Sequence, residues 1–302
     1  MSLHRKCQRN MPSQPTRWAV FTPNRKLMKK ILLLLVFSFS FLVSFAQSDD
    51  FGMDFSVDVE KKLRPGTHVN VEGGVRTMDH TKKVDRWTVG VGADQRLYTN
   101  GTFDLKAGVK WEYMWMNYPE QTNDKYEDFE YFDGETTTTK TEYMGYNHRH
   151  QFWRGRHRTS VSLTAGYQPN KRWSFSWKEM VQYSHFNKAT TTMDRYREDD
   201  DTEGLYVLQP DNIKEYKAKD RTLLRSKLGV DYNIRKCPVD PYVSAEYGCG
   251  LNYTTNKWKF TAGADIKLNK QNKIDVFYRY QTEDDEDEPN GHFIGVGYNL
   301  EF

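Results

Sequence analysis

The chain has 302 residues, of which 37% are hydrophobic and 15% aromatic, and its 44 Lys and Arg against 41 Asp and Glu give a net charge of +3. Eight of the basic residues and none of the acidic ones precede Gln47, so the remainder carries 36 basic and 41 acidic residues, a net charge of −5. This balance excludes the basic footprint of a nucleic-acid-binding protein, and no nucleic-acid partner is expected. The aromatic content favours strands over helices.

The first 46 residues have the pattern of an export signal. Lys29 and Lys30 precede an apolar run from Ile31 to Phe45, and Ser44 and Ala46 place small residues where a signal peptidase reads the chain. We expect cleavage between Ala46 and Gln47, with Met28 as the true start. The predicted organisation is a mis-assigned extension over 1–27, a signal peptide over 28–46 and a single β-barrel domain over 47–302.

From Asp50 onwards, apolar and polar residues alternate in segments of about ten residues separated by turn residues, which is the pattern of a transmembrane β-barrel. Between Leu224 and Ile234, for example, Leu228, Val230 and Tyr232 share one face. Eleven segments follow this rule: 51–63, 68–78, 86–98, 102–116, 157–168, 173–186, 222–234, 241–252, 257–268, 273–283 and 291–302. Because single-chain bacterial barrels normally have an even number of strands, with both termini in the periplasm, we expect about twelve, with ten as the alternative.

The connections between these segments fall into two classes. Short turns are predicted at 64–66, 100–101, 169–171 and 269–272, and long loops at 117–156, 187–221 and 283–290. Counting back from a periplasmic C-terminus places the long loops outside the cell. The predicted fold is therefore an all-β, antiparallel outer-membrane barrel that follows a cleaved signal peptide.

The two faces of the predicted strands differ in chemistry. The apolar face is rich in Trp, Phe and Tyr, as the interfacial girdles of a membrane barrel require, whereas a soluble sandwich or lipocalin-like barrel would need a core of Leu, Ile and Val. The polar face carries both charge signs, and we expect it to fill a narrow lumen with paired side chains. The charged residues on this face include Asp94, Arg96, Lys106, Lys110, Arg225, Lys227, Asp231, Lys259, Asp265, Asp275 and Arg279.

The last strand, 291–302, places Tyr298, Leu300 and Phe302 on one face. It resembles the C-terminal insertion signal of Gram-negative outer-membrane barrels, which implies that the barrel assembly machinery is a partner and that the chain resides in the outer membrane. Longer phrases resemble a family of uncharacterised bacterial outer-membrane proteins, the domain-of-unknown-function family number 2490. These phrases are Asp85-Arg86-Trp87 with Gly90-Val91-Gly92, Trp153 to Arg158, Leu224 to Lys227, Tyr232 to Pro238, Phe277 to Gln281 and Asn290-Gly291-His292.

The resemblance covers most of the chain after the signal peptide, but it implies no chemistry, because the family has no assigned activity. Gly155 stands where the family pattern has Pro, a change that we expect to affect only local turn geometry. No phosphate-binding glycine loop or zinc-ligand spacing is visible, so no cofactor and no metal are expected. The acidic run 283–288 lacks the spacing of a calcium loop, and we interpret it as a solvated loop.

Two groups of residues suggest more specific roles. The first group contains His148, His150 and His157, followed by Ser160 and Ser162, which are residue types that a lipid-modifying barrel enzyme uses. Both serines are expected to face the lumen, and no acidic residue that would orient a histidine is visible. We therefore expect no enzymatic activity. The second group, Arg154, Arg156 and Arg158, suits contact with the phosphates of lipopolysaccharide. The alternative for these arginines is pairing with acidic loop residues such as Glu127 or Asp128.

The sequence therefore predicts an uncharacterised outer-membrane β-barrel with a structural or surface-binding role and without catalysis. The first alternative is a porin-like narrow channel for a small solute that the sequence does not identify, and the second is a lipid-modifying barrel enzyme. The two non-catalytic readings differ in whether side chains close the charged lumen or leave a continuous path.

Overall fold

The computed structural model describes residues 50–132, 134–199, 202–210, 212–283 and 290–302. The predicted extension 1–27, the signal peptide 28–46 and the cleavage position at Ala46 and Gln47 lie outside the described residues. Every regular element in the described ranges is a β-strand. No helix in these ranges has the length and apolar character needed to cross a membrane.

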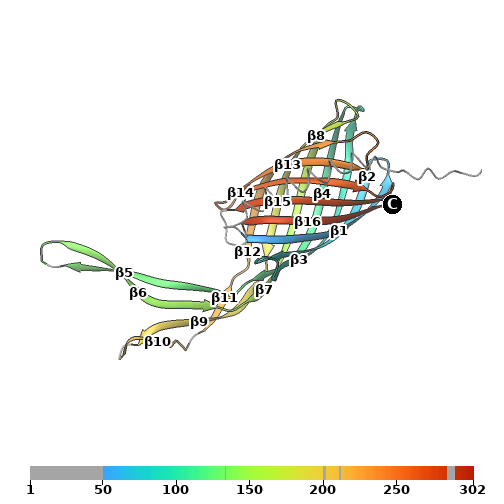
Figure 1. Cartoon of the computed structure of the whole chain (residues 1–302). Coiled ribbons are helices and arrows are strands. Elements are labelled where there is room, and N and C mark those ends of the chain that lie inside the picture. Colours follow the sequence, from blue (N-terminus) through green and yellow to red (C-terminus); the bar gives the residue numbers. More distant parts are fainter. Residues whose placement is uncertain (1–49, 133, 200–201, 211, 284–289) are drawn as a thin grey trace, which may run out of the picture. The chain divides into compact units, whose positions relative to one another are not determined.

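Within the described ranges, eleven strands close a barrel (Figure 1). The wall strands are β1 (Asp50–Arg64), β2 (Thr67–Met78), β3 (Lys83–Thr99), β4 (Phe103–Tyr118), β7 (Phe152–Tyr167), β8 (Trp173–Phe186), β12 (Lys219–Tyr232), β13 (Val239–Gly250), β14 (Asn256–Lys267), β15 (Asn272–Glu283) and β16 (Gly291–Glu301). Each of the eleven predicted segments corresponds to one wall strand. The all-β barrel predicted from the alternation is therefore confirmed.

The expected strand count of twelve, or alternatively ten, is wrong, because the barrel closes with a parallel pair. Strand β1 pairs with β16 in parallel, in a register that runs from Asp50↔Gly291 to Glu60↔Glu301. A barrel in which every neighbour is antiparallel must have an even number of strands, and one parallel pair removes that condition. As a result, the first described residue, Asp50, and Phe302 lie at opposite ends of the barrel. The expectation that both ends of the chain share the periplasmic side concerns residues before Asp50, which lie outside the described residues.

A second sheet forms where the sequence predicted two long loops. It contains β5 (Gln121–Phe132), β6 (Thr137–Arg149), β9 (Ala189–Asp199), β10 (Thr202–Leu208) and β11 (Ile213–Tyr216), in the order β10-β9-β6-β5 with β11 also paired to β9. We call it the rim sheet. Its strands are held by aromatic contacts, with ring centroids 5.4 Å apart for Tyr126 and Tyr143 and 4.6 Å apart for Tyr146 and Tyr196. The segments 117–156 and 187–221 therefore hold strands, but these strands lie outside the wall.

The short turns at one end of the barrel follow from their asparagine and glycine residues. The side-chain oxygen of Asn100 accepts hydrogen bonds from the backbone N–H groups of Thr102 and Phe103, and Asn170 and Asn269 cap their turns in the same way. Gly66 has a φ of 86°, a conformation that glycine adopts without strain. We call this end of the barrel the turn end, and the opposite end, where 119–151, 187–218 and 284–290 connect the strands, the loop end.

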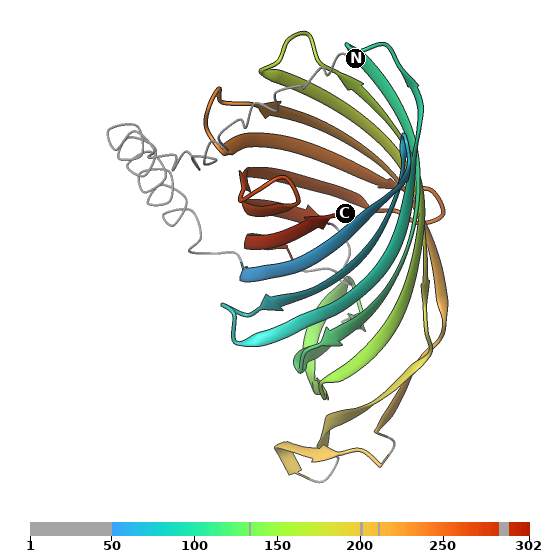
Figure 2. The same ribbon diagram turned by 90° about the vertical axis from the view of Figure 1, so that its right-hand side faces the viewer.

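The wall separates an apolar exterior from a polar interior. Figure 2 shows the barrel with the side that carries the C-terminus in Figure 1 turned toward the viewer. On β3 the outward side chains of Trp87 and Val89 are 55% and 49% exposed. The side chain of Arg86, which faces the lumen, is 4% exposed. Outward aromatic side chains meet near the turn end, where the ring centroids of Trp173 and Tyr232 are 4.6 Å apart. An apolar outer face with aromatic residues toward its edges is the surface of a transmembrane barrel.

The inward side chain of Phe277 fills space that two neighbouring glycines leave open. A Cβ added at Gly295 would lie 2.0 Å from Phe277 Cζ, and one added at Gly263 would lie 2.8 Å from Phe277 Cβ. We expect Gly295→Val to lower the free energy of unfolding by about 1–3 kcal/mol, because the Phe277 ring or the backbone beside it must shift to admit the new side chain. Urea unfolding in lipid vesicles, followed by tryptophan fluorescence, measures this change.

A double-mutant cycle supplies the control. Phe277→Ala removes the clashing ring, so the cost of Gly295→Val is expected to be smaller in that background than in the wild type. If the two substitutions lower stability additively, the contact between Phe277 and Gly295 does not limit the packing of β15 against β16.

Candidate functional site

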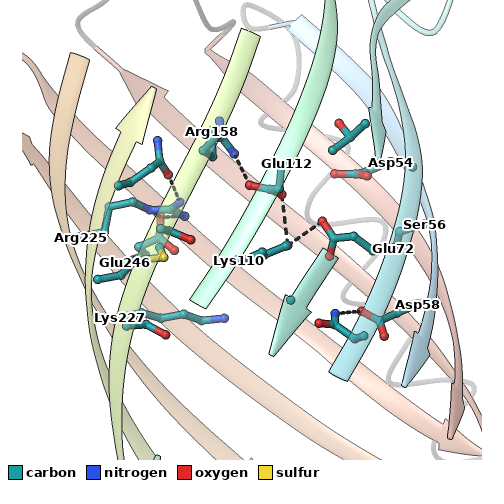
Figure 3. A pocket seen from close by; sticks show the side chains of 18 of the residues that line it. Asp54, Ser56, Asp58, Glu72, Lys110, Glu112, Arg158, Arg225, Lys227 and Glu246 are labelled. Atoms are coloured by element: carbon teal, nitrogen blue, oxygen red, sulfur yellow. Dashed lines mark hydrogen bonds and ion pairs between the residues drawn. The ribbon is translucent and has the colours of Figure 1, made fainter. Parts of the chain in front are cut away.

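The lumen contains a polar cavity of about 610 Å³, lined by the inward faces of the wall strands (Figure 3). The prediction that the polar faces line the lumen is confirmed for Asp94, Lys110, Arg225, Lys227, Lys259, Asp275 and Arg279, all of which line this cavity. The predicted pairing of the inward charges is also found, in three separate groups that join strands along the wall around the remaining cavity.

The first group is a chain of alternating charges across β2, β4 and β7. Lys110 Nζ lies 2.6 Å from Glu72 Oε1 and 3.1 Å from Glu112 Oε1, and Arg158 Nη1 lies 3.5 Å from Glu112 Oε2 (Figure 3). Strand β3 passes between β2 and β4 with Gly90 at this level, where a Cβ would lie 3.1 Å from the Cγ atoms of both glutamates. Glycine at this position therefore gives the glutamates room to reach the same lysine.

The second and third groups tie other parts of the wall together. Arg225 donates from Nη2 to Glu246 Oε1 at 2.5 Å and from Nη1 to Gln182 Oε1 at 2.7 Å. Across the closing seam, Asp54 Oδ2 accepts from Arg76 at 3.1 Å and from Arg279 at 3.0 Å. Because these contacts join neighbouring strands, and in two cases strands separated by one other strand, the networks tie the register of the wall together from inside.

Two lysines in the cavity are not part of these groups. Lys178 and Lys227 are direct neighbours in the register of β8 and β12, and in the described part of the chain neither has a hydrogen bond or a close ion pair. Carboxylates act on them only at longer range, Asp94 on Lys178, and Glu246 and Asp231 on Lys227. Nine basic and seven acidic side chains line the cavity, so basic groups outnumber acidic groups by two. Lys178 and Lys227 match this excess in number.

Toward the loop end, buried inward side chains cover this cavity, and four of them, Arg76, Arg86, Met114 and Gln182, also line it. Inward side chains with less than 9% exposure come from β2, β3, β4, β7, β8, β12, β14, β15 and β16. They are Arg76, Arg86, Met114, Met116, Arg154, Arg156, Gln182, Ser184, Phe186, Leu223, Lys257, Gln281 and Phe293. We call this set the sealing layer. A side chain on a water-filled path would be exposed to solvent, so no such path passes along these residues.

Phe186 is a central member of the sealing layer and is only 1% exposed. Four cationic groups surround its ring, with Arg154, Arg156, Lys219 and Arg221 at 5.3, 4.7, 4.9 and 5.4 Å from the centroid. The face of an aromatic ring attracts cations, and the attraction is stronger where water is excluded. Phe186 thus holds together positive groups that would otherwise repel one another.

The arginines predicted to contact lipopolysaccharide belong to the interior of the barrel. Arg154 donates to the backbone oxygens of Asn187 and Lys217 at 2.8 and 2.7 Å, and Arg156 lies beside Ser184 and Phe186. Arg158 pairs with Glu112 and not with the predicted loop acids Glu127 or Asp128. With Arg154 and Arg156 only 3% and 6% exposed, these side chains are not available to a lipid headgroup on the outer surface.

The candidate catalytic residues do not meet. His157 faces outward, with its ring 4.9 Å from that of Tyr113, whereas Ser160 and Ser162 line the cavity on the inner face. His148 and His150 lie on the rim sheet. Only the first residue of the acidic run 283–288 is described, and residues 284–288 lie outside the described residues.

The residues of the predicted insertion signal lie on the closing seam. Phe302 donates its backbone N–H to Glu60 O at 2.9 Å, and Tyr298 is 37% exposed on the outer face. That the barrel assembly machinery recognises Tyr298, Leu300 and Phe302 stays a prediction. The sealing layer was not predicted, although a signal for it exists: Met114, Met116, Phe186 and Phe293 are apolar residues at inward parity near the loop end of their strands.

Comparison with known proteins identifies a family. A family model described as "Protein of unknown function (DUF2490)" matches residues 51–292. No curated protein matches the chain. The beta domain of the Bordetella autotransporter BrkA is similar in structure, with 15% identity, coverage of 80% of this chain and 86% of that chain, and a TM-score of 0.40.

Two further solved structures show weaker similarity. A Pseudomonas aeruginosa FadL homologue has 13% identity and a TM-score of 0.36, over 73% of this chain and 58% of that chain. The CymD monoaromatic hydrocarbon channel has 10% identity and a TM-score of 0.26, over 77% of this chain and 82% of that chain.

Proposed function

The chain belongs to the DUF2490 family of proteins of unknown function, and we propose that it is a non-catalytic outer-membrane barrel that keeps its lumen closed and carries the rim sheet at the cell surface. The apolar, aromatic exterior supports placement in the membrane. The short turns then face the periplasm and the rim sheet faces outward, as the distribution of turns and loops requires.

The observation that carries this proposal is the sealing layer. A porin-like protein needs a continuous hydrated path, whereas the inward side chains at the loop end of this barrel are packed against one another and excluded from water. The cavity below the layer is lined by charged residues and ends at Met114, Arg76 and Arg86. Solute that entered this cavity would meet a closed end.

The rim sheet supports the surface-binding part of the proposal. Its aromatic ladder continues from Tyr143 to Tyr206, with ring centroids 5.4 Å apart, and Tyr131 and Lys140 donate hydrogen bonds to Glu142 at 3.1 and 2.8 Å. The hydrogen bond from Lys140, reinforced by that from Tyr131, lowers the pKa of Glu142. The sheet thus presents ordered polar and aromatic side chains, a composition common in binding surfaces.

A planar-bilayer recording tests the proposal. The refolded wild-type chain is expected to insert without producing stepwise conductance, because the sealing layer blocks the path. Insertion is verified separately by resistance of the folded band to heating in detergent and by recovery of the protein from the membrane. Stepwise conductance from inserted wild-type protein would replace this proposal by the narrow-channel alternative.

The absence of catalysis is tested with the same preparation. The refolded protein is expected to leave phospholipid and lipid A intact, because His157 and Ser160 lie on opposite faces of β7. Lipid cleavage that disappears in His157→Ala would show instead that the barrel is a lipid-modifying enzyme.

A further inference from the structure

Four potential metal ligands share one face of the rim sheet. His148 lies near the end of β6 and His150 directly follows that strand, so the two side chains are two residues apart on an extended backbone and point the same way. The register places Gln121 opposite Arg149, and hence Glu120 beside His150, while Asp194 on β9 lies opposite His148. The two histidines are therefore flanked by one carboxylate from each neighbouring strand.

The distances bring these groups within reach of one ion. His148 Nε2 lies 2.6 Å from Glu120 Oε1, His150 Nε2 lies 2.8 Å from Asp194 Oδ2, and the two imidazole centroids are 5.0 Å apart. One ligand atom each from Glu120, His148 and His150 lie within 4.8 Å of one another. Ligand atoms at about 2.0–2.2 Å from a tetrahedral zinc ion lie about 3.4 Å apart, so side-chain rotations must bring these three groups closer together. Asp194 lies outside this group and must also rotate toward the ion.

A hydrogen bond orients one of the histidines as metal sites require. Thr122, opposite His148 in the register, places its Oγ1 3.0 Å from His148 Nδ1. If Nδ1 carries the proton and donates to Thr122, the lone pair of Nε2 points toward Glu120 and the shared face. Metal-binding histidines commonly have their second ring nitrogen fixed by such a partner.

We propose that this face of the rim sheet binds one divalent transition-metal ion of the zinc type, through Nε2 of His148 and His150 and the carboxylate of Glu120, with Asp194 as the fourth ligand. Imidazole combined with carboxylate suits zinc, copper and nickel, whereas calcium and magnesium prefer oxygen ligands alone. The ion replaces the two histidine–carboxylate hydrogen bonds. It links β5, β6 and β9, which belong to two different connections of the barrel, and so stabilises the rim sheet.

The described residues contain one other group with suitable spacing, and it provides an internal control. Glu60, His68 and Glu301 lie together at the turn end, with a single imidazole and two carboxylates. His68 is already paired with Glu60. Because a site with one nitrogen ligand holds zinc more weakly than a site with two, variants of His68 separate binding at the turn end from binding at the rim sheet.

The test uses the full chain without a histidine tag, refolded in detergent, stripped of metal and titrated with Zn²⁺ against a chromophoric chelator. The wild type is expected to bind one Zn²⁺ tightly, and Co²⁺ in its place is expected to give the visible absorption of a tetrahedral site. His148→Ala with His150→Ala is expected to abolish both signals, whereas His68→Ala leaves them unchanged. Thr122→Val is expected to weaken binding about tenfold, since it removes the orienting partner.

Folding is checked for each variant by circular dichroism and by heat-dependent gel mobility, and His150→Asn serves where the double variant does not fold. The proposal is overturned if the folded His148 and His150 variants retain the tight site, if His68→Ala removes it, or if the wild type binds no zinc. These results do not depend on whether the lumen conducts, so this proposal and the closed-barrel proposal can fail separately.

Discussion

Replacing Lys110 by methionine is expected to lower the free energy of unfolding by about 1–3 kcal/mol, between the cost of losing an exposed ion pair and that of removing one partner from a fully buried pair. Lys110 is the only cation that bridges Glu72 and Glu112 in the described network, at 2.6 and 3.1 Å. Without it, two carboxylates face each other in a partly buried lumen, and Arg158 can neutralise only Glu112. Urea unfolding in lipid vesicles, followed by tryptophan fluorescence, gives the difference in free energy.

Lys227→Met provides the matched control. It makes the same chemical change in the same cavity, but Lys227 has no close ion pair in the described structure and lies beside another cation, Lys178. The substitution is therefore expected to change stability by less than about 1 kcal/mol, as exposed or unpaired charges usually do. Equal losses for the two variants would show that the charge network does not stabilise the barrel and that only side-chain volume matters.

Opening the sealing layer is expected to convert a silent barrel into a conducting one. The combined substitutions Phe186→Ala and Phe293→Ala remove the two least exposed aromatic side chains of the layer. The cations that surround Phe186 then face a hydrated space, and their mutual repulsion keeps that space open. We expect stepwise, anion-selective conductance, because Arg154, Arg156, Lys219 and Arg221 line the new opening.

Each of these substitutions costs about 3–5 kcal/mol in a well-packed core, so folding must be verified before the recording. Met116→Ser is a smaller opening of the same layer and serves where the double variant does not fold. Phe175→Ala is the control, since this side chain is on the outer face, 40% exposed, and its loss should leave the bilayer silent. A folded variant of the layer that stays silent would show that other residues close the lumen.

The wall of the barrel could be predicted from the sequence because each wall strand has one face in an apolar environment and the other in a polar one. That contrast gives the alternation by which all eleven segments were found. The error lay in adjusting the count to an even number. No local pattern distinguishes a parallel from an antiparallel neighbour, because the pairing of β1 with β16 joins residues at opposite ends of the described chain.

The rim sheet could not be predicted in the same way. Residues such as Thr137, Thr138 and Thr139 on β6 are solvent-exposed, and both faces of β5 are largely exposed as well. Without a buried face there is no alternation of hydrophobicity, and the segments resemble loops. The metal-site candidate shares this origin, since His148 and Glu120 are brought together only by the pairing of β5 with β6.

The placement of Arg154, Arg156 and Arg158 was predictable from information already in the sequence. Ser160 and Ser162 have inward parity, and the same two-residue period continues back through Arg158 to Arg154 along an unbroken strand, β7. The three guanidinium groups therefore belong on the lumen side. The interpretation of these arginines as lipid contacts rested on their position near the membrane edge. It did not take into account that β7 directs their side chains into the lumen.

The parallel pairing of β1 with β16 has a consequence for how the protein folds. Most other neighbours in the wall are joined through turns or local connections, so they can associate as soon as both strands exist, whereas this pair must wait until the last strand has been made. Until then the nascent wall is an open sheet whose two edges expose unpaired backbone groups, a state prone to aggregation. Pairing of this one seam removes both open edges at once, so the period in which the wall can associate with other chains ends when β16 meets β1.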